Sequence, residues 1–272
     1  MELGIFETVL TRPTLAETLD AVKAAGFSTI QFDFATVGLS SMPTEIPASV
    51  TSDIRREADA RGITIAAVGG TYNMIHPDQR VRAGGMASLR AIAASCATIG
   101  TSIITLSTGT RDATNMWRRH PDNDTPDAWN DLLAAMTSAL LIAEEFEVIL
   151  AFEPEPANVA SSPAKAMQLL DEIPHPRLKI CFDAANIAAS DLTRDPAVVI
   201  DEAFALFGNE IMMAHGKDIT AEGEFCAAGS GIVPWPRCVR RFAEVGYAGP
   251  LVLHSLKERE IATARAAIEG VG

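Results

Sequence analysis

Two carboxylates and two imidazoles stand at the ends of short apolar runs in the second half of the chain. Glu153 follows VILAF, Asp183 follows LKICF, His215 follows EIMMA, and His254 ends PLVLH. Carboxylate oxygens and imidazole nitrogens are the donors that suit Mn²⁺, Mg²⁺, Co²⁺ or Zn²⁺. Because polar residues at the carboxyl ends of parallel barrel strands meet at one mouth, these four side chains predict a site for one divalent metal ion.

The elements that would carry these residues repeat along the whole chain. Helical patterns alternate with eight apolar or β-branched runs, which are GIFETVL, STIQFDF, GITIAAV, SIITLS, VILAF, LKICF, EIMMA and PLVLH. Near-continuous apolar strands joined by helices are typical of a parallel sheet that is covered on both faces. Eight such units predict a (β/α)8 TIM barrel, with a single domain over residues 1–272.

An open doubly wound sheet is the alternative arrangement of the same elements. That fold carries a glycine-rich GxGxxG turn directly after its first strand. No such motif follows GIFETVL, and the Gly229-Ser230-Gly231 stretch comes late in the chain. The sequence therefore favours the closed barrel.

Capping signals mark where the intervening helices begin and end. Thr14 and Glu17 form a capping-box pattern before the first helix. A cap residue precedes a proline at two further helix starts, Thr125-Pro126 and Ser162-Pro163. Glycines that would stop helices stand at Gly26, Gly62, Gly100 and Gly246.

The composition excludes several classes of function. With 272 residues, of which 48% are hydrophobic, the chain can bury a large core. The formal charge of -13 would repel a phosphate backbone, so we expect no nucleic-acid partner. The amino terminus lacks a signal-peptide pattern and the apolar runs are too short to span a bilayer, which predicts a cytoplasmic protein with no membrane partner. The four cysteines show no CxxC spacing, so neither a zinc knuckle nor a disulfide framework is indicated.

Alternation along the strands gives each candidate ligand an apolar neighbour two residues earlier. If Glu153 points into the mouth of a barrel, Ala151 points into its interior. The same spacing puts an apolar residue below each of the other three ligands, namely Cys181, Met213 and Val252. Packing of these apolar groups against the outer helices is an alternative that the spacing leaves open.

Four longer segments carry a resemblance to a known family. They are AFEPEPANV, ICFDAANIA, MAHGKDI and YAGPLVLHSL, with a Gly-x-Gly followed by a Trp before the last. In this order they resemble the sugar phosphate isomerase/epimerase family of xylose isomerase-like barrels, which includes ketose 3-epimerases, hydroxypyruvate isomerases and inosose-processing enzymes. The resemblance covers essentially the whole chain.

The resemblance implies a TIM barrel and one divalent ion held by a Glu, an Asp, a His and a second Glu. In the epimerases the two Glu residues flank the substrate as acid and base. Glu153 matches the first Glu, Asp183 the Asp and His215 the His.

Three positions depart from the family pattern. His254 stands where the epimerases carry the second Glu, Asn186 where many carry a His, and Val159 where another Glu often follows. An imidazole at position 254 can ligate the ion or act in catalysis, but it is not a carboxylate base. The proton shuttle of a ketose 3-epimerase, which uses two carboxylates, is therefore not directly available to this chain.

Glu155 is the candidate for the missing carboxylate. It shares its strand parity with Glu153 and lies two residues further out. A loop glutamate between Pro154 and Pro156 that faces water fits the same sequence equally well. We therefore assign catalysis to Glu153, with His254 and Glu155 as the further candidates.

Polar residues after five of the expected strands form a candidate substrate-binding ring. They are Asn73, His76, Arg111, Asn158, Asn186 and Lys217. Such a ring suits a polyhydroxylated substrate, and Arg111 and Lys217 are also suited to a phosphate or carboxylate. Ion pairs with neighbouring acids are the alternative for both cations. We expect the long connection from Ser107 to Pro126 to form a lid or wall over the mouth.

These observations predict a metal-dependent isomerase or epimerase that acts on a small sugar, keto-polyol or related hydroxy-carbonyl compound. A bound ion would stabilise the ene-diolate that forms when the intervening C–H proton is removed. A dehydratase of a keto-inositol and a non-catalytic sugar-binding barrel are the alternatives. The resemblance and the outer ring of helices are compatible with a homo-oligomer, whose symmetry no residue pattern decides.

Overall fold

Eight parallel strands close into a barrel in the computed structural model, which describes residues 1–270. Their order around the barrel is β1-β10-β7-β6-β5-β4-β3-β2. The strands are β1 (Leu3–Phe6), β2 (Thr29–Phe32), β3 (Thr64–Gly69), β4 (Ile103–Ser107), β5 (Ile149–Glu153), β6 (Leu178–Asp183), β7 (Ile211–Gly216) and β10 (Leu251–Leu253). Each predicted run overlaps one of these strands. The TIM barrel is confirmed, and the open doubly wound sheet is wrong because β1 pairs with β10.

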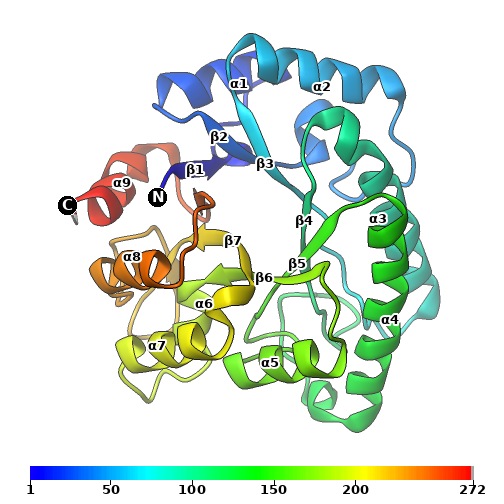
Figure 1. Cartoon of the computed structure of the whole chain (residues 1–272), viewed down its shortest axis with the longest axis vertical. Coiled ribbons are helices and arrows are strands. Elements are labelled where there is room, and N and C mark those ends of the chain that lie inside the picture. The colour runs from blue at the N-terminus through cyan, green and yellow to red at the C-terminus, as the bar shows by residue number, and fades with distance from the viewer. Residues whose placement is uncertain (271–272) are drawn as a thin grey trace.

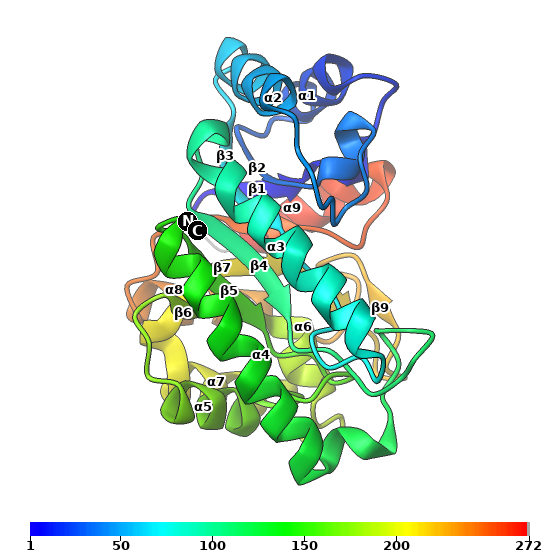
Figure 2. The same ribbon diagram turned by 90° about the vertical axis from the view of Figure 1, so that its right-hand side faces the viewer.

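Helices surround the strands on all sides (Figure 1). They are α1 (Leu15–Ala24), α2 (Ala48–Ala60), α3 (Gln79–Ile99), α4 (Pro126–Glu145), α5 (Pro163–Glu172), α6 (Ala184–Ala189), α7 (Pro196–Phe207), α8 (Trp235–Glu244) and α9 (Ile261–Glu269). The long helices α3 and α4 pack side by side along one flank (Figure 2). Within the described residues, no helix is long and apolar enough to cross a bilayer.

Short elements occupy several of the connections. Five 3-10 helices are η1 (Glu7–Leu10), η2 (Phe34–Val37), η3 (Pro121–Asp124), η4 (Gly208–Glu210) and η5 (Glu258–Glu260). A two-stranded antiparallel hairpin, β8 (Asp218–Ile219) with β9 (Phe225–Cys226), follows β7 at the carboxyl end of the barrel. The sequence patterns had not predicted this hairpin, because two-residue strands are too short to show a period.

The predicted helix ends are confirmed. Thr14 and Glu17 form both halves of the capping box before α1. The side chain of Thr125 accepts from the N–H of Ala128, and that of Ser162 accepts from the N–H of Lys165. The four predicted stop glycines have positive φ, at 82° for Gly26, 58° for Gly62, 92° for Gly100 and 71° for Gly246.

The first apolar run is a strand only over its first part. Its remainder, Glu7–Leu10, forms η1, and the Glu7 side chain is fully buried against η2. Glu7 Oε1 accepts hydrogen bonds from the N–H of Asp33 at 2.9 Å and from the Thr36 hydroxyl at 2.7 Å. These two bonds link η1, directly after β1, to the residues that follow β2.

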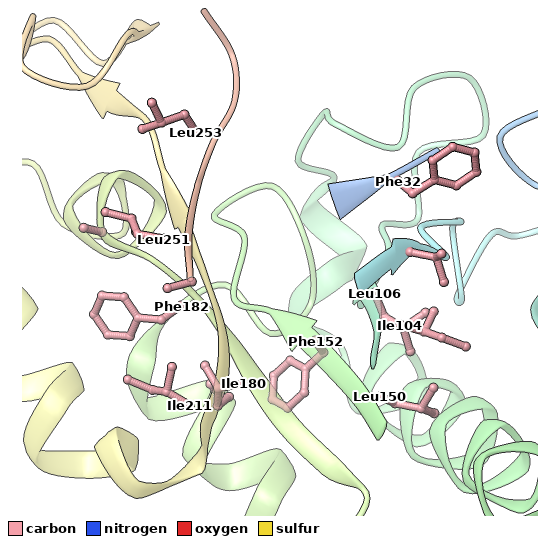
Figure 3. Packing of buried hydrophobic residues seen from close by; sticks show 14 of the residues in the cluster. Phe32, Ile104, Leu106, Leu150, Phe152, Ile180, Phe182, Ile211, Leu251 and Leu253 are labelled. Carbon is pink, nitrogen blue, oxygen red and sulfur yellow. The ribbon is translucent and has the colours of Figure 1, made fainter. Parts of the chain in front are cut away.

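Apolar side chains on the two faces of the strands form separate cores. Residues that point outward, such as Leu106, Phe152 and Phe182, pack among the buried groups that face the helices (Figure 3). The residues that point inward form a smaller cluster, consisting of Ala67, Ala151, Cys181, Met213 and Val252. The apolar residues two positions before the four candidate ligands therefore lie inside the barrel, and the alternative that they pack against the outer helices is wrong.

Candidate active site

A layer of polar side chains lies directly above this small apolar cluster, at the carboxyl ends of the strands. His254 Nε2 lies 3.0 Å from Asp183 Oδ2, and His215 Nδ1 lies 3.2 Å from Glu153 Oε2. The ring centroids of the two histidines are 4.6 Å apart. Donor atoms of Asp183, His215 and His254 all lie within 4.8 Å of one another. The structure thus brings together four residues that are spread from position 153 to position 254.

Asp183 is the most enclosed member of this group. Its Oδ1 accepts from the N–H groups of Ala185 at 2.9 Å and Asn186 at 3.2 Å, and so caps α6. Burial acts to raise the pKa of Asp183, but the ammonium of Lys217 and the hydrogen bond from His254 hold it below its usual value. Asp183 is therefore an anion whose Oδ2 faces the site.

Lys217 places a positive charge beside the two central carboxylates. Its Nζ lies 3.4 Å from Asp183 Oδ2, 3.9 Å from Glu153 Oε1, and 4.1 Å from the centre of the Phe225 ring. Burial acts to lower the pKa of Lys217, but the surrounding carboxylates more than offset this and raise it. The side chain is therefore a buried ammonium that is held by charge and by an aromatic face.

Glu155 turns into the site and is only 8% exposed, so its interpretation as a loop residue facing water is wrong. Asn186 Nδ2 donates to Glu155 Oε2 at 2.7 Å and to Glu153 Oε1 at 2.5 Å. Burial raises the pKa of Glu155 to about 7, with the ammonium of Lys217 opposing this effect and neighbouring carboxylates adding to it. A carboxyl group near neutrality can accept or return a proton.

His254 is held at both ring nitrogens. Burial lowers its pKa, so the ring is neutral near pH 7, with Nε2 donating to Asp183. Nδ1 then accepts from the hydroxyl of Ser255 at 3.1 Å. Ser255 has a φ of 55°, an uncommon conformation outside glycine that directs its side chain back to the imidazole.

The donor set and the charge fit a divalent cation. Among residues 1–270, Glu153, Glu155 and Asp183 face a single ammonium, that of Lys217, so two negative charges remain uncompensated when all three carboxyls are ionised. Asn186 Oδ1 is buried and has no hydrogen-bond partner among the described residues. Carboxylate oxygens and imidazole nitrogens are ligands for Mg²⁺, Mn²⁺, Co²⁺ and Zn²⁺.

Cys181 forms the floor of this site. Its sulfur lies within 4.8 Å of ligand atoms of both Glu153 and His215. Burial raises the pKa of Cys181 well above its usual value, so the group is a neutral thiol. Its packing with Ala151 and Met213 agrees with its predicted role as a small buried apolar residue.

Of the six predicted substrate-binding residues, Asn186 and Lys217 join the site and the other four hold loops together. Asn73 Oδ1 accepts from the N–H of Thr110 at 2.9 Å, and Asn158 Oδ1 from that of Gly109 at 2.7 Å. Arg111 forms an ion pair with Asp131 at 2.6 Å. His76 accepts a hydrogen bond from the N–H of Asp78 and lies within hydrogen-bond distance of the carbonyl of Ala113. Among the described residues, none of these four hydrogen-bonds to the acid and imidazole cluster. Arg111 instead forms an ion pair, as its alternative interpretation predicts.

The connection after β4 forms a wall beside the mouth. It is joined to the loop after β5 by hydrogen bonds from Val159 N–H to Gly109 C=O at 3.0 Å and from Asn123 Nδ2 to Ala157 C=O at 3.0 Å. Glu155 belongs to this second loop, where its own N–H donates to Ala160 C=O at 3.2 Å. Asn73 and Asn158 therefore support the wall that presents Glu155.

Sequence reasoning missed two contributors to the site. Gln31, on β2, accepts a hydrogen bond from His215 Nε2 at 2.7 Å and donates to Thr105 Oγ1 on β4 at 3.1 Å. The available signal was an amide side chain between Ile30 and Phe32, in the middle of the run STIQFDF. Asp218, in the segment MAHGKDI, carries the resemblance but had no assigned role; it accepts from three backbone N–H groups and the Trp235 indole and so holds the hairpin that carries Phe225.

A closed barrel of eight parallel strands defines the fold class as a TIM barrel. The polar cluster lies at the carboxyl ends of the strands, where TIM-barrel enzymes have their active sites. The chain belongs to the xylose isomerase-like TIM barrel family, whose model matches residues 19–271. No protein of curated function matches the sequence significantly.

Three solved structures illustrate how widely this fold is shared. The apo form of 3-keto-D-glucoside 4-epimerase YcjR from E. coli is 15% identical with a TM-score of 0.72, covering 100% of this chain and 98% of that one. The probable 3-DHS dehydratase AsbF from Bacillus anthracis is 13% identical with a TM-score of 0.77, covering 99% and 98%. A xylose isomerase-like protein from Mycobacterium smegmatis in complex with magnesium is 16% identical with a TM-score of 0.69, covering 94% and 86%. At these identities the likeness establishes the fold.

Proposed function

We propose that this protein is a divalent-metal-dependent isomerase or epimerase that acts on a small sugar, keto-polyol or related hydroxy-carbonyl compound. One observation carries the proposal: donor atoms of Asp183, His215 and His254 within 4.8 Å of one another, with Glu153 in contact with His215. Membership of the xylose isomerase-like family supports it. YcjR, which has the same fold, is named as a sugar epimerase.

Glu153, Asp183 and His215 would hold the ion, with His254 as the fourth ligand. When bound, the ion would draw electron density from adjacent substrate oxygens and so favour an ene-diolate. Each imidazole nitrogen now faces a polar atom within 3.2 Å, so ligation would replace one of these contacts on each ring. The two uncompensated negative charges of the site would then be balanced.

Proton transfer falls to Glu155 in this proposal. Asn186 holds one carboxyl oxygen of Glu155, which leaves the other for the C–H proton next to the substrate carbonyl. Lys217 would orient the substrate oxygens and offset the negative charge that develops on them. Return of this proton by Glu155 to the neighbouring carbon gives an isomer, whereas an epimer requires a second acid that protonates the same carbon from its other face.

A dehydratase is the second candidate, and His254 favours it. A neutral imidazole stands where the epimerases have a second carboxylate, and its Nε2–H is held by Asp183. Loss of water needs no second carboxylate, because the proton that Glu155 takes from the C–H bond can leave with the departing β-hydroxyl. Assays for loss of water against interconversion of isomers separate the two reactions.

The proposal is tested by metal analysis together with a panel of ketoses and keto-polyols in deuterated buffer. We expect about one divalent ion per chain and exchange of substrate C–H for deuterium. Glu153→Gln and Asp183→Asn should lose both, whereas Glu144→Gln on the outer helix α4 should lose neither. Full metal retention in both site variants would overturn the metal site, and binding of the sugars without exchange would instead indicate a non-catalytic binding barrel.

A further inference from the structure

A buried chain of hydrogen bonds crosses the barrel interior and ends on His215. It runs from Thr105 on β4 to Gln31 on β2 and then to His215 on β7, with distances of 3.1 Å and 2.7 Å. These residues are 3%, 3% and 5% exposed. Because β2 is adjacent to neither β4 nor β7 in the sheet, both bonds span the interior and do not follow a strand pair.

The donor and acceptor at each of these hydrogen bonds determine which nitrogen of His215 carries the hydrogen and which one faces the other proposed metal ligands. Gln31 directs its amide nitrogen to the Thr105 hydroxyl, so its carbonyl oxygen Oε1 points to His215 Nε2. An amide oxygen can only accept, so Nε2 must carry a hydrogen. When the ring carries this one hydrogen, the lone pair belongs to Nδ1, which lies 3.2 Å from Glu153 Oε2. Two electron-pair donors that face each other in this way suit a bound cation.

We propose that Gln31, backed by Thr105, is a positioning residue that fixes His215 as the Nε2–H tautomer and so presents Nδ1 as the metal ligand. This inference rests on the proposed metal site, which it deepens by assigning the ligating atom. The energetic reason is that hydrogen-bond partners on the far side of a ligating imidazole fix its orientation and increase its basicity. Loss of such a partner typically lowers metal affinity by about 10- to 100-fold.

Four single variants separate this role from simple packing. Gln31→Met removes the amide but keeps a similar volume, whereas Gln31→Glu retains an acceptor for Nε2–H. Thr105→Val removes the hydroxyl that orients the amide. Thr29→Val is the matched control, because Thr29 is also 3% exposed and also lies on β2, but it hydrogen-bonds Glu2 and not the site.

The measurements are Zn²⁺ affinity by titration calorimetry and ¹H–¹⁵N correlation spectra of the His215 ring, recorded without metal and with Zn²⁺. We expect an Nε2–H ring in the wild type in both states and in Gln31→Glu. Zn²⁺ affinity should fall about 10- to 100-fold in Gln31→Met, fall less in Thr105→Val, and stay unchanged in Thr29→Val.

An Nδ1–H ring in the wild type, or wild-type Zn²⁺ affinity in Gln31→Met, would overturn the inference. The metal-free spectra keep this result distinct from a failure of the proposed function. If wild-type protein binds no Zn²⁺ but shows the Nε2–H ring that Gln31→Met loses, the positioning role stands and the metal site falls.

Discussion

At the scale of single residues, the site depends on ionisable groups that the fold removes from water. Asp183, Lys217 and Glu155 are all buried, and each has a pKa moved from its usual value by the balance of burial and neighbouring charge. Glu153 ends β5 and Glu155 lies two positions later in the loop, and of the two it is Glu153 whose carboxylate lies 3.2 Å from His215 Nδ1. The two carboxylates are therefore expected to differ in function.

We expect Glu155→Gln to separate catalysis from metal binding. Removal of the proton acceptor should lower the rate of substrate C–H exchange by about 10²- to 10⁴-fold, while metal content stays close to one ion per chain. Glu153→Gln should lose the metal as well. The check is to measure both quantities on the same preparations, and equal metal loss in the two variants would contradict the division of roles.

Glu7 allows a prediction about stability because its hydrogen bonds go to Asp33 and Thr36 and not to the acid and imidazole cluster. Burial raises its pKa from 4.5 to about 8, so between these values the folded chain holds a proton that the unfolded chain releases. The free energy of unfolding should therefore fall as pH rises through this window, by about 1.4 kcal/mol per pH unit. Glu7→Gln, which is neutral at every pH, should remove this loss.

Thermal melts from pH 5 to pH 8 test this expectation. The Tm of Glu7→Gln should exceed that of the wild type by an increasing margin as pH rises, at about 2–4 °C per kcal/mol. Glu222→Gln, an exposed change in the β8–β9 hairpin, is the control and should follow the wild type. A constant difference between Glu7→Gln and wild type across the pH range would rule out a buried neutral carboxyl.

At the scale of elements, packing behind a strand and the anchoring of one hairpin hold the site in place. Phe182, directly before Asp183, stacks on Phe204 of α7 at 4.4 Å and meets Phe242 of α8 edge-on at 5.4 Å. This aromatic cluster fixes the end of β6. On the other side, Asp218 holds the β8–β9 hairpin, which places Phe225 over the Lys217 ammonium.

Asp218→Ala should therefore loosen one segment and leave the barrel closed. Three N–H groups and one indole lose their acceptor, at a cost of about 1–3 kcal/mol for each group that stays buried and unsatisfied. Hydrogen exchange should rise in residues 219–233 and stay unchanged in β4–β6. Asp191→Ala, which removes an exposed turn contact with Thr193, is the control. Unchanged exchange in residues 219–233 would show that the hairpin does not depend on Asp218.

At the scale of the whole molecule, closure of the barrel creates the proposed cation site. Glu153, Asp183, His215 and His254 come from the ends of β5, β6, β7 and β10, so the unfolded chain has no such cluster. An ion that binds only the folded state stabilises it by about 2.7 kcal/mol at 100 times its Kd. We expect Mn²⁺ to raise the Tm by several degrees and a chelator to reverse the shift. An equal Mn²⁺ shift in Asp183→Asn would place the ion elsewhere.

The sequence by itself determined the elements and the strand-end residues. Periodicity and helix caps depend on neighbours a few positions apart, so the sequence predicts all eight strands and the marked helix ends. It also predicts the inward-facing apolar residues two positions before Glu153, Asp183, His215 and His254. The fold of the family was likewise identified from short segments around these residues.

Only the tertiary structure decided which polar groups reach the site. Glu155 turns inward because two loops are joined by hydrogen bonds, and Gln31 reaches His215 across the interior from a strand that is not its neighbour. Asn73, His76, Arg111 and Asn158 bond to loop and helix residues, and their assignment to substrate binding stays a prediction. The physical reason is that side-chain hydrogen bonds and ion pairs form between residues distant in the chain, and their geometry exists only after the barrel has closed.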